Sequence, residues 1–148
     1  MKKAQFNIYI FLLSYFLIGC QVFNYTKQQY VNTVSYFNTY YNTSKLFDDA
    51  EKEILAAQAA SQEKGTFTIP STAKTKLTSC IEKSSKLLSY YPTSELVDDA
   101  LLLIGKSYVY LEDDAKAEKK FVELITQYPT SDLVIEAKLW YGRSLLHQ

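Results

Sequence analysis

The sequence predicts an all-α protein in which antiparallel helix hairpins stack side by side. The first observation is a repeat: the fifteen residues 91–105 return 37 residues later as 128–142, with nine identical positions. The second is the spacing of apolar residues inside the repeat, which recur every three or four positions as on a helix with one buried face. The third is a proline at the same place in both copies, which ends the preceding helix. Hairpins that recur in this way bury their open sides only against their neighbours.

A third, less regular copy lies upstream and sets the division into units. Residues 40–54 share nine of fifteen positions with residues 90–104, at an offset of 50 residues. The additional 13 residues fit an insertion at 61–71, where glycine and proline break the helical pattern. We therefore expect units at about 43–91 with this insertion, at 92–128, and at 129–148 as an incomplete unit.

The predicted helices follow in chain order. Serine and threonine of each linker can accept backbone N–H bonds at a helix start, and acidic residues then crowd the first turn, where they offset the helix dipole. In the first helix, rings and one valine recur at 4-3-4 spacing and predict one apolar face: Tyr30, Val34, Phe37 and Tyr41. An alternative register pairs the first two helices as a hairpin, with Ala50 at its small-residue position. The helices are expected over 25–41, 44–60, 72–90, 94–110, 113–127 and 131–148.

The last predicted helix has no helix after it to cover its apolar side. Leu139, Trp140 and Leu146 would be left partly bare. We therefore expect this sequence to be a partial version of a longer protein.

The residues of the second unit resemble the tetratricopeptide repeat (TPR) family. In that family a glycine and an alanine let paired helices approach closely, and a proline ends the second helix. The resemblance implies a right-handed, TPR-like α-solenoid whose repeats bind other proteins. Leu101 departs from it, because many repeats carry tryptophan there, and so does Leu55, where the first unit lacks the glycine. The matching positions are Gly105, Tyr108, Ala117, Phe121, Leu124 and Pro129.

The N-terminus resembles the signal of a bacterial lipoprotein. A basic start at Lys2 and Lys3 precedes an apolar stretch, 6–19, that is shorter than the roughly 20 residues of a spanning helix. Leu17-Ile18-Gly19-Cys20 then matches the lipobox, which implies cleavage before Cys20 and lipid attachment to its sulfur. This division gives a signal peptide at 1–19, a lipidated tether at 20–24 and a repeat domain at 25–148. The alternative is an uncleaved membrane anchor with an incidental cysteine.

The position after the cysteine bears on where the protein is sorted. Gln21, and not aspartate, follows Cys20. By the sorting rule for such lipoproteins, this residue implies the periplasmic face of the outer membrane. A lipobox followed by such repeats also resembles the periplasmic lipoproteins of the BamD type, which help to assemble outer-membrane β-barrels, and related gliding and secretion lipoproteins. We expect a membrane-anchored periplasmic scaffold that binds protein partners; the alternative is a structural or cell-wall-associated envelope lipoprotein.

Composition and motifs give no case for catalysis or for nucleic acid. Sixteen basic and sixteen acidic side chains balance to zero formal charge, so nothing attracts a polyanion. The sequence has no Gly-rich phosphate loop and no Ser/His/Asp set, and the single histidine, His147, is a poor metal ligand by itself. Cys80 is expected to be a buried thiol. We therefore expect no enzyme activity, no cofactor, no metal and no small-molecule substrate.

The candidate partner-binding residues lie on the first helix of successive units, which lines the concave face of a TPR stack. Lys106 and Arg143 are 37 positions apart and should stand side by side. Two cations beside a ring can hold an acidic or carboxylate-bearing segment; the alternative is that they are solvated charges. The candidate positions are Leu102, Lys106, Tyr110, Leu139 and Arg143, with His147 next in the series.

Overall fold

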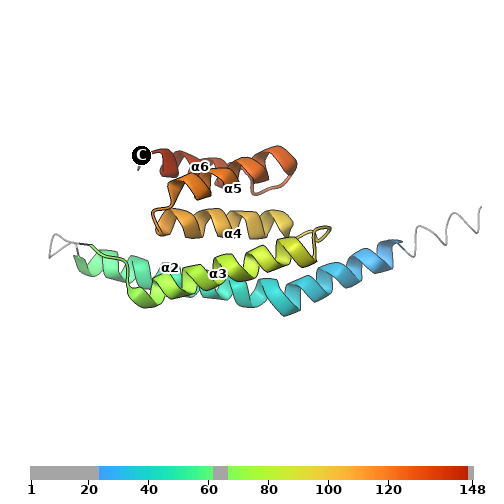
Figure 1. Cartoon of the computed structure of the whole chain (residues 1–148), viewed down its shortest axis with the longest axis horizontal. Coiled ribbons are helices and arrows are strands. Elements are labelled where there is room, and N and C mark those ends of the chain that lie inside the picture. The colour runs from blue at the N-terminus through green and yellow to red at the C-terminus, as the bar shows by residue number, and fades with distance from the viewer. Residues whose placement is uncertain (1–23, 62–66, 147–148) are drawn as a thin grey trace, which may run out of the picture.

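The computed structural model describes residues 24–61 and 67–146, and all of their regular structure is helical (Figure 1). The predicted signal peptide, Cys20 and His147 lie outside these residues. The all-α prediction is confirmed. After a helical segment at 24–35, the elements are the π-helix η1 (Tyr36–Tyr40), α2 (Tyr41–Ser61), α3 (Ser71–Tyr90), α4 (Val97–Tyr110), α5 (Asp114–Gln127) and α6 (Val134–Leu145).

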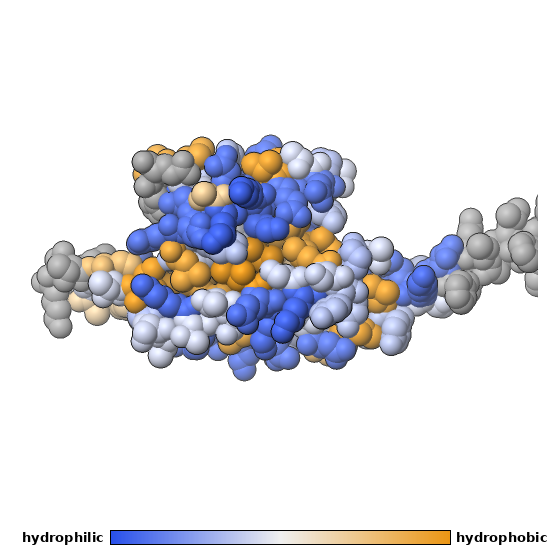
Figure 2. Space-filling model, in the orientation of Figure 1, coloured by the Kyte–Doolittle hydropathy of each residue, from blue (hydrophilic) through white to orange (hydrophobic). Residues whose placement is uncertain are grey.

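The helices form antiparallel pairs that stack, as the repeat predicted. The long α2 packs against α3, α4 packs against both α3 and α5, and α6 covers α5 (Figure 1). Two apolar clusters make the core, one between α2, α3 and α4 and the other between α3, α4, α5 and α6. α4 contributes to both clusters, and ten of its fourteen residues are buried. Figure 2 shows an apolar band between the α2–α3 pair and the helices above it.

The two Tyr-Pro-x-Ser linkers fold in the same way. The carbonyl oxygen of Tyr91 accepts the Ser94 N–H at 2.9 Å, and the Ser94 Oγ accepts the Leu96 N–H at 3.2 Å. In the second linker, Tyr128 and Ser131 make the same two bonds at 3.0 and 3.1 Å. These turns occupy the residues that were predicted to begin the helices. α4 and α6 therefore begin three residues later than expected, at Val97 and Val134.

The third copy of the linker does not form a turn. Asn42 stands where the other copies have proline, and it keeps the backbone N–H that a helix needs. The chain is helical from residue 24 to Ser61, so the predicted break between the first two helices is absent. The alternative hairpin of 25–41 with 44–60 needs that break, and α2 instead pairs with α3.

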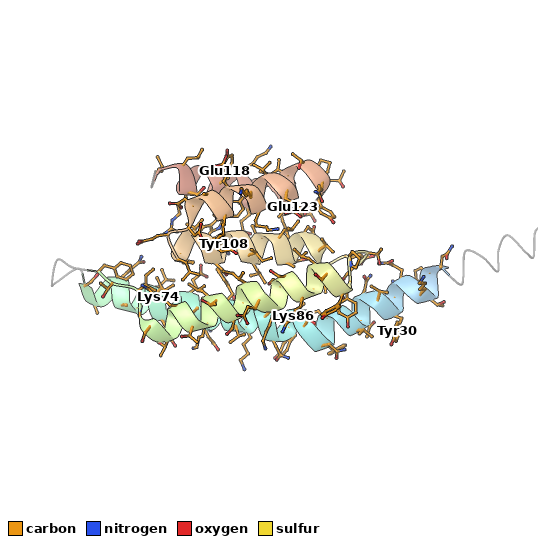
Figure 3. The ribbon with its side chains drawn as sticks, viewed as in Figure 1. Tyr30, Lys74, Lys86, Tyr108, Glu118 and Glu123 are labelled. Atoms are coloured by element: carbon orange, nitrogen blue, oxygen red, sulfur yellow. The ribbon has the colours of Figure 1, made fainter. Side chains whose placement is uncertain are left out.

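The apolar face predicted for the first helix points outward. Tyr30, Phe37 and Tyr41 are all exposed, and Figure 3 shows Tyr30 projecting from the helix. The side that packs is polar: Asn32 Oδ1 accepts the Glu95 N–H at 3.0 Å, and Ser35 Oγ lies 2.7 Å from Ser94 Oγ. Apolar periodicity was therefore a misleading guide in this segment, because hydrogen bonds to the linker determine which side is inside.

The π-helix η1 changes the register of the long helix. The Tyr41 N–H donates to the Tyr36 carbonyl, five residues back. The side chains of these residues are therefore turned through a smaller angle about the helix axis than they would be in an α-helix. Ser35 and Tyr40 are thereby turned toward the same neighbour. The Tyr40 hydroxyl donates to Asp99 Oδ1 at 2.9 Å, which ties the helix to the first turn of α4.

At Gly105, the Phe121 ring of α5 lies directly against the backbone of α4. A Cβ added to it would lie 2.8 Å from two atoms of the Phe121 ring, and that ring is fully buried and cannot move aside. Gly142 occupies the same repeat position on α6, yet a Cβ there would have no neighbour within 4 Å. The TPR-like role of glycine therefore applies to Gly105 alone within the described residues.

We predict opposite effects of alanine at these two glycines. Gly105→Ala should lower the free energy of unfolding by about 1–3 kcal/mol, because the new methyl group overpacks against Phe121. Gly142→Ala should leave it unchanged or raise it by up to about 1 kcal/mol, because alanine favours a helix over glycine. Chemical denaturation followed by circular dichroism measures both. Equal destabilisation by the two variants would contradict the packing described here.

Candidate protein-binding site

Rings and cations of α2, α4 and α6 meet on one side of the stack. We call this group the cation–aromatic cluster: Phe47, Lys106, Tyr110, Trp140 and Arg143. The Tyr110 and Trp140 rings are 5.5 Å apart in an edge arrangement, and the Phe47 and Tyr110 rings are 6.1 Å apart. The cluster is assembled only by stacking, because each of the three helices supplies at least one member.

Lys106 is held inside the cluster. Its Nζ lies 4.8 Å from the centre of the Phe47 ring and 5.0 Å from that of Trp140, and it pairs with Glu136 Oε1 at 3.0 Å. Only 15% of the side chain is exposed. The lysine is therefore neither a solvated charge nor a free ligand, because neighbouring groups already use its charge.

Arg143 is the exposed cation of the cluster. Its Cζ lies 4.9 Å from the centre of the Trp140 ring and 5.4 Å from that of Tyr110. Within the described part of the chain, no carboxylate lies at ion-pair distance from its guanidinium. The Trp140 and Tyr110 rings lie against the guanidinium, which is also within hydrogen-bonding reach of the Tyr110 hydroxyl. A planar group of this kind can grip a carboxylate with two hydrogen bonds.

Tyr110 joins the cluster to α2. Its hydroxyl donates to Glu51 Oε1 at 2.8 Å. Burial, followed by the hydrogen bond to the Glu51 carboxylate, raises the pKa of Tyr110 to about 12. The phenol therefore stays neutral at physiological pH and acts as a hydrogen-bond donor within the fold.

The five residues predicted to bind partners differ in their exposure and in their contacts. Lys106 and Arg143 do stand side by side, each against the same Trp140 ring. Leu139 is exposed, as a contact residue should be. Leu102 and Tyr110 are buried, so they support the surface and do not form it. For Leu102 the reason is that α6 packs over α4 at this position of the repeat.

Sequence reasoning missed two members of the cluster, Trp140 and Phe47, and the ion-pair partner of Lys106, Glu136. Trp140 occupies the repeat position of Leu103, and a ring there, one turn before Arg143, was a readable signal. Phe47 and Glu136 could not be found in this way, because their roles depend on how far each helix is displaced along its neighbour. Glu136 lies in the first turn of α6, where acidic residues were predicted in general, but it also neutralises Lys106 across the α4–α6 contact.

The other candidate groups of the described residues lie outside the cation–aromatic cluster. No three potential metal ligands of the His, Cys, Asp or Glu type gather within the described residues. Cys80 is fully buried, as predicted, and burial raises the pKa of its thiol. None of the described helices combines the length and the apolar character that crossing a membrane requires. An open pocket of about 270 Å³ lies apart from the cluster, lined by Asn32, Thr33, Tyr36, Phe37, Glu95 and Leu96.

The shifted tyrosine gives a prediction for alkaline solution. The pKa of Tyr110 in the folded protein, about 12, is above its ordinary value of 10. Between these values the unfolded chain loses the phenolic proton while the folded chain keeps it, so stability falls as the pH rises from 10 to 12. Tyr110→Phe should remove about 1 kcal/mol of this loss, measured by denaturation at pH 9 and pH 11.5. A variant with the same alkaline loss as the wild type would contradict the assignment.

Comparison with known proteins identifies one repeat. Residues 99–131, which hold most of α4 and all of α5, match the family model of the tetratricopeptide repeat. The match begins within the second unit predicted from the sequence, 92–128, and ends three residues beyond it. No curated protein and no solved structure matched the chain. The chain thus contains a tetratricopeptide repeat, set in a TPR-like stack of helix pairs, and repeats of this kind generally mediate protein–protein interaction.

Proposed function

We propose that this protein is a lipid-anchored scaffold of the bacterial envelope that binds protein partners and has no catalysis of its own. The observation that carries the proposal is Arg143, an exposed cation that lies against the Tyr110 and Trp140 rings on the side of the stack formed by α2, α4 and α6. A tetratricopeptide repeat in the chain supports a protein-binding role.

The chemistry of the site favours an acidic partner. Arg143 offers a guanidinium without a carboxylate in the described residues, and Trp140 beside it offers an aromatic surface. Guanidinium groups and large rings are the side chains that most often dominate protein interfaces. A partner segment with a carboxylate next to an apolar side chain would use both groups at once.

The proposed location rests on the N-terminal sequence. A lipobox that ends at Cys20 supports attachment of acyl chains, and two or more chains hold a soluble domain stably at a membrane surface. Gln21 supports the outer membrane, with the domain on the periplasmic face. The exposed rings of Tyr30, Phe37 and Tyr41 follow on the helix nearest to this anchor. Rings of this kind favour the boundary between membrane and water, which agrees with a position close to the surface.

Within this role we propose assistance in outer-membrane protein assembly, as in the BamD-type lipoproteins that the sequence resembles. Nascent barrel proteins and their chaperones would supply the partner segments. The second candidate is a structural or cell-wall-associated lipoprotein, including a component of gliding or secretion machinery. It is favoured by the repeat alone, because a stack of helix pairs can space or hold other envelope components.

Removal of the cysteine tests the anchor. Cys20→Ala should abolish labelling of the protein by radioactive palmitate and leave the signal peptide uncleaved, because the sulfur that accepts the lipid is gone. Labelling followed by electrophoresis of the membrane fraction measures both effects. Cys80→Ala is the matched control and should label normally, since Cys80 is buried in the fold. Palmitate incorporation that persists in Cys20→Ala would remove the basis for the proposed location.

Reversal of charge at Arg143 tests the binding site. Arg143→Glu should reduce the partner protein captured from crosslinked envelopes at least fivefold, because an acidic segment would be repelled. Lys86→Glu, at an exposed position on α3 (Figure 3), should leave capture unchanged. Quantitative mass spectrometry of the captured material gives the ratio. Retention on peptidoglycan beads that is equal in both variants, with no protein captured, would instead support the cell-wall role.

A further inference from the structure

A pocket lies where the long N-terminal helix crosses the linker between α3 and α4 (Figure 1). Its volume is about 270 Å³. One wall comes from the helix just before and within η1, and the other comes from the end of the linker. We call it the linker pocket, and its lining residues are Asn32, Thr33, Tyr36 and Phe37 on the helix and Glu95 and Leu96 on the linker.

The helix wall of the linker pocket presents two aromatic rings. The Tyr36 and Phe37 rings meet edge to face with their centres 5.2 Å apart, and the Tyr36 ring also lies 6.1 Å from Tyr40 and 6.3 Å from Tyr41. These rings gather at the π-helical turn η1, and turns of this kind occur frequently at functional sites. Phe37 is 68% exposed, so its ring is available to a ligand. The face of such a ring carries partial negative charge and attracts a cation.

The linker wall of the pocket supplies a carboxylate. The Glu95 N–H donates to Asn32 Oδ1 at 3.0 Å, which fixes this residue against the helix wall. Among the described residues, no basic side chain lies at ion-pair distance from the Glu95 carboxylate. None of the six lining residues is basic. The pocket therefore combines a carboxylate that has no ion-pair partner in the described residues with exposed ring surface, and both attract a positive charge.

The size and the apolar lining of the linker pocket limit what can fill it. Sites for small-molecule ligands usually measure roughly 300–1,000 Å³, whereas a volume of about 270 Å³ suits one long side chain. Leu96 and the Phe37 ring can contact an apolar stem, while Glu95 pairs with a charged end. Lysine and arginine combine such a stem with a cation. Arginine suits the pocket better, because its planar guanidinium stacks on a ring and grips a carboxylate with two hydrogen bonds.

Resting on the proposed function as a protein scaffold, we propose that the linker pocket binds an arginine side chain of a partner protein. The guanidinium lies over the Phe37 ring and pairs with the Glu95 carboxylate, and the stem packs against Leu96. The scaffold thus has a second site, whose charge preference is opposite to that of Arg143. The bound side chain contacts both the first helix and the α3–α4 linker, and it strengthens a junction that hydrogen bonds already hold.

The probe for the linker pocket is N-acetyl-argininamide, which carries the arginine side chain without a second charge. The isotope-labelled full chain in nonionic detergent micelles is titrated with it and followed by amide NMR spectra. The amide signals of residues 32–37 and 95–96 should shift, with millimolar affinity that weakens at high salt. N-acetyl-citrullinamide has nearly the same shape without the charge, so it is the matched control and should leave these signals in place.

Two variants of the protein separate the effects of the charge and of the ring. Glu95→Gln should weaken binding of the arginine probe about twofold to fivefold, as the loss of an exposed ion pair would. Phe37→Leu should weaken it by a similar factor, about twofold to fivefold, because leucine keeps apolar contact and lacks the ring face. Glu82→Gln, at an exposed position on α3, is the control and should bind normally. Circular dichroism spectra should be unchanged in all three variants, since the replaced side chains are exposed.

The inference is overturned if the arginine probe shifts no signal, if the citrulline probe shifts the same signals equally, or if either pocket variant binds as tightly as the unchanged protein. O-phosphoethanolamine, a lipid headgroup that also carries an ammonium group, is titrated in the same way. Tighter binding of this headgroup than of the arginine probe would assign the pocket to a lipid and also overturn the inference. If the arginine probe fails while Arg143→Glu still reduces capture from envelopes, the linker pocket is not a partner site and the proposed function stands.

Discussion

The contact between Gly105 and the Phe121 ring sets the distance between α4 and α5, and the other layers depend on that distance. The missing Cβ lets a large, fully buried ring lie against the backbone of α4. Because α5 lies so close to α4, its residues Ala117 and Leu124 also belong to the core cluster that contains Leu101. A ring of this size contributes about 1.5–3 kcal/mol when it is fully buried. α4 is consequently enclosed from three sides, which explains why most of its residues are inside.

The enclosure of α4 also places the cation–aromatic cluster. Lys106 projects from a helix that neighbouring helices enclose, and its ammonium group lies against Phe47 of α2 and Trp140 of α6. A lysine without nearby charge would be costly to keep at 15% exposure, and Glu136 supplies the compensating carboxylate. The same Trp140 ring then supports Arg143 on its outer side. Stacking thereby converts two repeat-related cations into one internal contact and one available donor group.

The repeat made much of the fold predictable from the sequence, and single residues account for what was not. The unit boundaries near Pro92 and Pro129 could be read, because proline acts on the backbone alone. The same reading failed at Asn42, because residues 40–54 share nine of fifteen positions with residues 90–104 but lack the proline that stops a helix. The candidate site was predictable only as far as the 37-residue spacing brings Lys106 and Arg143 together. Their partners Phe47 and Glu136 depend on the displacement between helices, which periodicity does not encode.

In the first helix, hydrogen bonds, and not buried apolar side chains, determine which side packs against the rest of the protein. Its inward contacts are hydrogen bonds: Asn32 Oδ1 accepts the Glu95 N–H, and Ser35 Oγ bonds with Ser94 Oγ. Each such bond contributes only about 0.5–1.5 kcal/mol net. The helical segment 24–35 has one buried residue, Ser35, whereas the apolar clusters hold α2 to α6 together. Local opening should therefore begin in this segment and stop at η1, where Tyr40 is fastened to Asp99. The segment nearest to the proposed anchor is thus the least firmly attached part of the scaffold, while the surface for partners is built on the most firmly packed part.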